Sequence, residues 1–272
     1  MSVKLAFVIT FIFSSFFTYE YNHSQAAIEL ERDNFSKGEL LTYRLHYGFI
    51  TAGKATIAVD NDIYDINKKP CYSISVTGSS IGTFDLFIKI RDTWSTYIDT
   101  TDYVPQKSVR NIEEGRYKLL EEATYYYAEE KVNVLRMQPG RQNEVKDYKV
   151  PHNVQDIVSG FYYLRRINFN KLTKGDTLSI NAFFDKNNYK FRVRYMGKGT
   201  VKTDAGKFRA IKLVPVMPKN TMFDGEESIK VWISDDKNKI PLLAEAEMYV
   251  GAVQLELTQY KGLRNQPSFI KK

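Results

Sequence analysis

The chain has 272 residues, of which 43% are hydrophobic and 14% aromatic, and its formal net charge is +7 at pH 7. Its single cysteine, Cys71, excludes an intrachain disulfide, so an apolar core must hold the fold, and we expect the thiol to be packed inside it. Because lysines and arginines are interspersed with acids, the charge indicates solubility and weak attraction to anionic surfaces such as glycans or lipid headgroups. We expect no nucleic-acid partner, because the start of the chain predicts export.

The start of the chain has the composition of a secretory signal peptide. Lys4 supplies a positive charge, residues 5–17 form an apolar run, and residues 24–26 place small side chains at a cleavage position. The run is shorter than the ~20 residues of a membrane-spanning helix, although an uncleaved anchor is the alternative. We expect residues 1–26 to be removed and residues 27–272 to form a single β-rich domain, exported and either periplasmic or secreted. No further transmembrane segment follows, and no cysteine stands at the cleavage position to make a lipoprotein.

Strict alternation of apolar and polar residues dominates the rest of the chain. Leu41, Tyr43 and Leu45 point to one side, with polar residues between them, which is the pattern of a half-buried strand. Short turns separate the runs, so the pattern predicts an antiparallel meander in a mainly β protein: a large curved sheet or an incomplete β-barrel. The alternating segments are 41–49, 55–59, 72–76, 86–94, 178–184, 189–195, 199–202, 208–214, 229–233, 240–249 and 253–257.

One central segment, residues 153–166, has helical periodicity instead. Asn153 is the predicted N-cap, with Asp156 in the first turn near the positive end of the helix dipole. Arg165 and Arg166 are predicted to close the helix at its negative end. We expect this short helix to pack on the concave or open side of the curved sheet.

Sequence motifs for catalysis or metal binding are weak in this chain. Residues 78–82 match the G-x-S-x-G pattern of serine hydrolases, but that motif requires a helix after the serine, and residues 83–90 read as a strand. After residue 26, the soft or borderline metal ligands are limited to Cys71, His46 and His152, which are far apart in sequence. We therefore expect no catalytic residue, no cofactor and no metal, with a hydrolase lacking a recognisable motif as the last alternative.

The high aromatic content is the remaining sequence feature that bears on ligand binding. The chain has 19 tyrosines, including a run at residues 125–127. Strands favour such residues for packing alone, but an aromatic-lined groove in a curved sheet is also suited to an acyl chain or a sugar.

The chain resembles the bacterial exported family DUF3108, a domain of unknown function. The resemblance implies an exported β-rich protein and brings no established activity or catalytic residues. The segments that carry it are FIKIRD (87–92), YID (97–99), VP (104–105), VQDIVSGFYYLR (154–165), AGKF (205–208), VWISDD (231–236) and IP (240–241).

These observations predict a non-enzymatic cell-envelope protein that binds an amphiphile or a glycan on the concave face of its sheet. The alternative is a structural or assembly factor that acts through an envelope protein partner, by adding a strand at an exposed sheet edge. The candidate ligand-binding or structural residues are Tyr47, Trp94, Asp156, Ser159, Tyr163, Arg165, Trp232 and Asp236.

Overall fold

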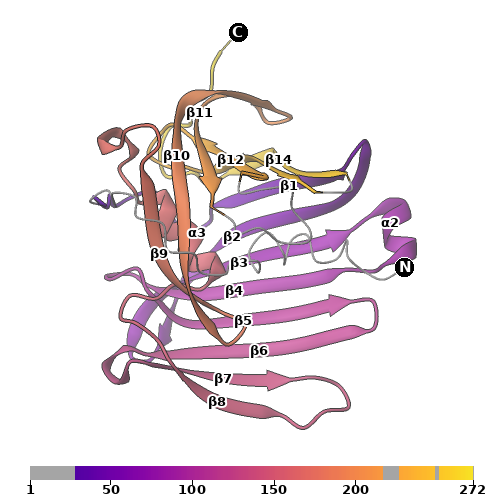
Figure 1. The fold of residues 1–272 in the computed structure, drawn as a ribbon, viewed down its shortest axis with the longest axis vertical. Helices are drawn as coiled ribbons and strands as arrows, with labels where there is room; N and C mark the ends of the chain where they lie inside the picture. The colour runs from indigo at the N-terminus through magenta and orange to yellow at the C-terminus, as the bar shows by residue number, and fades with distance from the viewer. Residues whose placement is uncertain (1–27, 217–226, 249–250, 272) are drawn as a thin grey trace.

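The computed structural model describes residues 28–216, 227–248 and 251–271, so the predicted signal peptide lies outside the described residues. All 14 strands form one antiparallel sheet that is strongly curved but does not close (Figure 1). The mainly β prediction is therefore confirmed. The strands are β1 (Leu40–Tyr47), β2 (Ile50–Ile66), β3 (Lys69–Ser80), β4 (Arg91–Asp99), β5 (Pro105–Glu114), β6 (Tyr117–Tyr126), β7 (Lys131–Met137), β8 (Glu144–Lys149), β9 (Thr177–Phe184), β10 (Asn187–Thr203), β11 (Gly206–Pro215), β12 (Ile229–Ser234), β13 (Pro241–Glu247) and β14 (Ala252–Lys261).

The strand order is that of two meanders joined at a seam. It reads β8-β7-β6-β5-β4-β3-β2-β1-β14-β13-β12-β11-β10-β9, so the first and last strands lie side by side in the middle of the sheet. Along the seam, Leu40 pairs with Lys261 and Tyr47 with Val253. The two ends of the sheet are β8 and β9.

The central helix, α3 (Ile157–Arg165), links the two meanders and lies on the concave side of the sheet (Figure 1). The predicted helix of residues 153–166 is confirmed in place, but its N-cap is Asp156 and not Asn153. Asn153 sits in a turn with φ of 61°, and Gln155 pairs in parallel with Ala182 of β9. The chain therefore turns at Asn153 and pairs with the edge of the sheet at Gln155 before the helix begins.

The core lies between α3 and the concave face. Val158 and Tyr162 of the helix pack against a buried cluster that includes Ile74, Trp94 and Ile98 from β3 and β4. Cys71 is fully buried and free, as predicted. The middle of the concave face is thus occupied by the protein's own helix.

The β9–β10 hairpin nearly closes the barrel. Phe183 packs with buried residues of β6 and β7, while Lys186 Nζ lies 2.8 Å from the Glu144 carboxylate of β8. Asn188 also donates a hydrogen bond of 2.8 Å to the Lys149 carbonyl. Side-chain contacts, and not a continuous strand ladder, join these two parts of the sheet.

The structure corrects the strand predictions in two places. The strand predicted for residues 83–90 is wrong, because residues 82–87 form the short helix α2 (Gly82–Phe87). The segments 189–195 and 199–202 are not separate strands but parts of the long β10, which has a bulge between Tyr195 and Lys198. Strands β5 to β8 were not predicted. Two 3-10 turns, Tyr127–Glu129 and Phe169–Lys171, complete the described elements.

Candidate functional site

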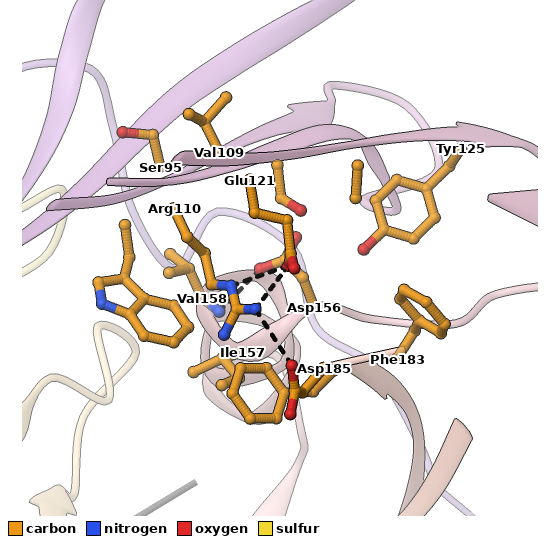
Figure 2. A pocket seen from close by; sticks show the side chains of 14 residues that line it. Ser95, Val109, Arg110, Glu121, Tyr125, Asp156, Ile157, Val158, Phe183 and Asp185 are labelled. Atoms are coloured by element: carbon orange, nitrogen blue, oxygen red, sulfur yellow. Dashed lines mark hydrogen bonds and ion pairs between the residues drawn. The ribbon is translucent and has the colours of Figure 1, made fainter. Parts of the chain in front are cut away.

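An interior polar pocket lies where the end of β9 meets the concave side of β5 and β6 (Figure 2). Its volume is about 20 Å³, which admits a water-sized molecule but no acyl chain or sugar ring. Two predicted residues, Trp94 and Asp156, lie in its wall. Other lining residues are Arg110, Glu121, Tyr125 and Asp185.

Two arginines and two acids neutralise one another in this wall. Arg110 Nε donates a hydrogen bond of 2.9 Å to Glu121 Oε1, and Arg136 Nε forms an ion pair of 3.0 Å with the second Glu121 oxygen. Both guanidinium groups reach Asp185 Oδ1. The distance is 3.7 Å from Arg110 (Figure 2) and 3.3 Å from Arg136. The Arg110 guanidinium also lies over the Trp94 ring, 5.1 Å from its centroid. This network ties the β9–β10 turn to β5, β6 and β7, so it holds the two ends of the open sheet together.

Asp156 is buried and its acceptor oxygens are committed to the protein. Oδ2 accepts a hydrogen bond of 2.6 Å from the Thr96 hydroxyl, and Oδ1 accepts from the backbone N–H groups of Val158 and Ser159. The Ser159 hydroxyl in turn accepts from the Asp156 N–H at 2.9 Å, which completes a capping box. Burial raises the pKa of Asp156, and these hydrogen bonds oppose that shift. Asp156 and Ser159 therefore anchor the start of α3 to β4.

Arg165, at the end of α3, is completely buried and paired with Glu39. Its two Nη atoms donate hydrogen bonds of 2.6 and 2.8 Å to the Glu39 carboxylate. Nε donates to the Asn238 carbonyl at 2.8 Å, and Nη2 also donates to the Asn34 carbonyl at 3.0 Å. Desolvation alone would lower the pKa of Arg165, but the Glu39 carboxylate outweighs it and the pKa is raised. The pair joins α3, the segment before β1 and the β12–β13 loop, so its role is structural.

Three further predicted residues lie apart from both pockets. Tyr163 is half-buried in the cluster under β9 and β10. Trp232 on β12 is half-buried, with Lys212 Nζ 5.5 Å from its ring centroid. Asp236 organises a turn, accepting hydrogen bonds from the backbone N–H groups of Asn238 at 2.8 Å and Ser268 at 2.6 Å.

A second pocket, the α2 pocket, lies on the concave side between α2 and the ends of β1, β2 and β14. Tyr47, a predicted site residue, lines it and meets Phe84 of α2 edge to face, with ring centroids 6.3 Å apart. The volume is about 30 Å³. The lining is mostly apolar and includes Leu45, Tyr47, Ala52, Phe84, Ile88 and Val253.

Two buried acids, Asp92 and Glu114, lie on the concave face near α2. Both carboxyl groups are buried, which favours a proton on Asp92. Burial raises the pKa of Asp92 to about 6, although the backbone N–H of Glu113 donates to Oδ1 at 3.0 Å and opposes the shift. Because the folded-state pKa is raised, the folded protein holds this proton more tightly than the unfolded chain. Stability is therefore expected to fall as pH rises between about pH 4 and pH 6.

Replacing Asp92 by asparagine should remove this pH dependence. We expect Asp92→Asn to gain about 2–3 kcal/mol relative to the wild type between pH 4 and pH 7.5, since two pKa units correspond to ~2.7 kcal/mol. Urea unfolding at each pH measures the difference. Asp85→Asn is the control, because Arg91 lowers the pKa of Asp85 to about 2. The pH dependence of Asp85 therefore lies below about pH 4, and the difference of this variant from the wild type should be nearly constant from pH 4 to pH 7.5. A constant difference between Asp92→Asn and the wild type across this range contradicts the assignment.

The serine of the G-x-S-x-G match has its hydroxyl engaged by neighbours. Ser80 Oγ donates to Asp85 at 2.5 Å and accepts from the Ile90 N–H at 2.9 Å. The helix that the motif requires is present as α2, contrary to the sequence prediction, but His152 contacts Tyr127 in another part of the fold. Within residues 28–216, 227–248 and 251–271, no group of three or more His, Cys, Asp or Glu side chains could hold a metal. In the same ranges, no helix combines the length and apolarity needed to cross a membrane.

The structure thus brings together only some of the predicted residues. Trp94, Asp156 and Ser159 meet at the start of α3, whereas Tyr47 lines the other pocket. Sequence reasoning missed the partners of these residues. Glu39, Arg110, Glu121, Asp185 and Phe84 come from distant or unassigned segments, and no short motif marked them.

An open, β-barrel-like antiparallel sheet that encloses one helix defines the class of protein. The family model described as "Protein of unknown function (DUF3108)" matches residues 42–258, and the chain belongs to this family. A search of curated proteins found no match.

One solved structure shares the fold at low sequence identity, and a second is more weakly similar. A β-barrel-like protein of domain of unknown function DUF1849 from Brucella abortus is 11% identical, with a TM-score of 0.55, and the alignment covers 86% of this chain and 99% of that one. The hypothetical protein CT021 from Chlamydia trachomatis is 8% identical, with a TM-score of 0.38 and coverage of 88% and 94%. The first likeness supports the fold, and neither assigns an activity.

Proposed function

We propose that the protein is an exported, non-enzymatic component of the cell envelope that holds the apolar part of an amphiphile beneath α2. The α2 pocket carries this proposal, because it is the apolar recess on the concave face that α3 leaves uncovered. Its lining of aliphatic and aromatic side chains suits an acyl chain better than a glycan, which needs several convergent polar groups. Export is supported by the sequence of residues 1–26, which favours the periplasm or secretion over a lipoprotein.

Helix α2 is suited to act as a lid over this pocket. At about 30 Å³ the pocket is too small for an acyl chain, so a ligand must displace the helix. The helix has six residues, none of them buried, and no side-chain hydrogen bond at its N-cap. Asp85 holds it in place through Ser80 at 2.5 Å and Arg91 at 2.8 Å. A short element with few buried contacts opens at low free-energy cost.

Strand addition by a protein partner is less well supported. The edge strand β8 has six residues, mostly exposed, and four of them are charged: Glu144, Lys146, Asp147 and Lys149. Short, charged edges disfavour pairing with another chain. The opposite edge, β9, is partly covered by Gln155, whose N–H donates to the Asn181 carbonyl at 2.9 Å.

Lipid binding is tested directly with purified protein. Native mass spectrometry of protein from its own host should show a bound amphiphile, and lysophosphatidylglycerol should bind saturably in a fluorescence competition assay. Ile88→Asp places a carboxylate in the lining of the pocket. It is expected to weaken binding about tenfold or more, because a carboxylate packed against the methylene groups of an acyl chain is poorly solvated.

Ile63→Asp is the matched control, since Ile63 is exposed and does not line the pocket. It should bind like the wild type. Empty protein from the host, together with no saturable binding by the wild type, overturns the proposal. Equal binding by Ile88→Asp and Ile63→Asp would place any ligand elsewhere.

A further inference from the structure

Large apolar side chains protrude from the end of the molecule where α2 lies. The exposed fractions are 106% for Phe49, 85% for Leu86 and 90% for Phe87. Ile50 and Tyr117 beside them are 52% and 45% exposed. Single exposed apolar residues are ordinary, but a group of this size at one place marks an interaction surface.

These residues belong to one continuous surface, which we call the α2 rim: Phe49, Ile50, Leu86, Phe87, Lys89, Arg116 and Tyr117. Three neighbouring turns carry them, the β1–β2 turn, the α2 segment and the β5–β6 turn (Figure 1). The Ile81 N–H donates to the Ala52 carbonyl at 3.0 Å, and the Gly115 N–H donates to the Lys89 carbonyl at 2.8 Å. These bonds hold the three turns against one another.

The charge of the rim is positive. Lys89 and Arg116 are exposed, and neither forms an ion pair within the part of the chain that the structure describes. The two acids at the surface of these turns are already paired with other cations. Asp85 pairs with Arg91 at 2.8 Å, and Glu113 pairs with Lys118 at 3.2 Å. A partner that meets this surface finds protruding apolar groups and uncompensated positive charge.

We propose that the α2 rim docks the protein on an anionic lipid bilayer. Phe49, Leu86 and Phe87 enter the headgroup region, and Lys89 and Arg116 contact the lipid phosphates. Aromatic and aliphatic tips flanked by basic residues are the combination that binds anionic membrane surfaces. The core of a protein–protein interface is closely packed. The apolar side chains of the α2 rim protrude singly from turns and do not form such a core. The inference rests on the rim alone and does not require the α2 pocket to bind a ligand.

Vesicle co-sedimentation tests the docking. The wild type should bind vesicles of phosphatidylcholine with phosphatidylglycerol about tenfold more strongly than vesicles of phosphatidylcholine alone, and high salt should weaken the difference. Phe49→Ser with Phe87→Ser should reduce binding about tenfold or more. Lys89→Glu with Arg116→Glu should abolish the preference for phosphatidylglycerol.

Ile63→Ser with Lys68→Glu is the matched control at the opposite end of the sheet, where both residues are exposed. It should bind vesicles like the wild type, and circular dichroism verifies that each variant is folded. Ile88→Asp separates the two proposals, since it should lose ligand binding and keep vesicle binding. Absence of wild-type vesicle binding, equal binding by rim and control variants, or a protein dimer that only the rim variants disrupt would overturn the docking proposal.

Discussion

Replacing Arg165 by methionine is expected to lower the free energy of unfolding by roughly 3–5 kcal/mol, because it leaves the Glu39 carboxylate buried without its cation. Both side chains are completely buried, and Arg165 supplies the two shortest hydrogen bonds that Glu39 accepts in this pair. After the substitution, the Tyr162 hydroxyl at 3.2 Å is the side-chain donor that remains. For a chain of this size the melting temperature should fall by roughly 6–20 °C, as measured by circular dichroism.

A double variant identifies the lost charge pair as the cause. The double variant Glu39→Met with Arg165→Met should recover much of the loss, because an apolar pair no longer holds an uncompensated charge. A loss of the same size in the double variant as in Arg165→Met contradicts the explanation.

Substitution of Gly262 by alanine is expected to cost about 3 kcal/mol or more, because the new methyl group meets main chain and not a movable side chain. Gly262 has φ of 69°, and its Cβ would overlap the Gly38 carbonyl oxygen and lie 2.8 Å from the Gly38 carbonyl carbon. Gly38 is itself fixed, since its N–H donates to the Val59 carbonyl at 3.0 Å. Neither chain can move without breaking the register at the start of β1.

Gly140 provides a closely matched control for this position. It has φ of 73°, but nothing lies within 4 Å of the Cβ it would carry. Gly140→Ala should therefore cost only the ~1–2 kcal/mol of the left-handed backbone conformation. Urea unfolding of both variants measures the difference, and equal losses would show that backbone conformation, not the contact with Gly38, decides the cost.

The sequence predicts strands where one face of the sheet is apolar. Leu41 and Tyr43 of β1, or Leu178 and Ile180 of β9, are buried on the concave side, so alternation reveals them. Strands β5 and β6 carry polar residues at buried positions, among them Gln106, Arg110, Glu114 and Glu121, and the period-two signal is lost there. Alternating Leu86, Ile88 and Ile90 predict a strand, whereas exposed Leu86 lies in α2.

The candidate site was less predictable because its contacts are long-range. Asp156 and Ser159 could be placed near the start of a helix, since capping depends on neighbouring residues. The partner of Arg165 lies 126 residues away, and that of Arg110 lies across a hairpin in a segment with no strand signal. Pairing at such separations follows from the register of the whole sheet, which no local pattern specifies.

The seam between β1 and β14 has a consequence for the order of folding. The strand at residues 252–261 is synthesised after the other described strands, yet it pairs with the earliest of them, at residues 40–47. Its contacts are therefore among the most distant along the chain, and contacts of high sequence separation form slowly. Until they form, each meander exposes a bare inner edge that favours aggregation. We expect a chain truncated before residue 252 to form two separate meanders, because β14, the strand that pairs with both β1 and β13, is missing.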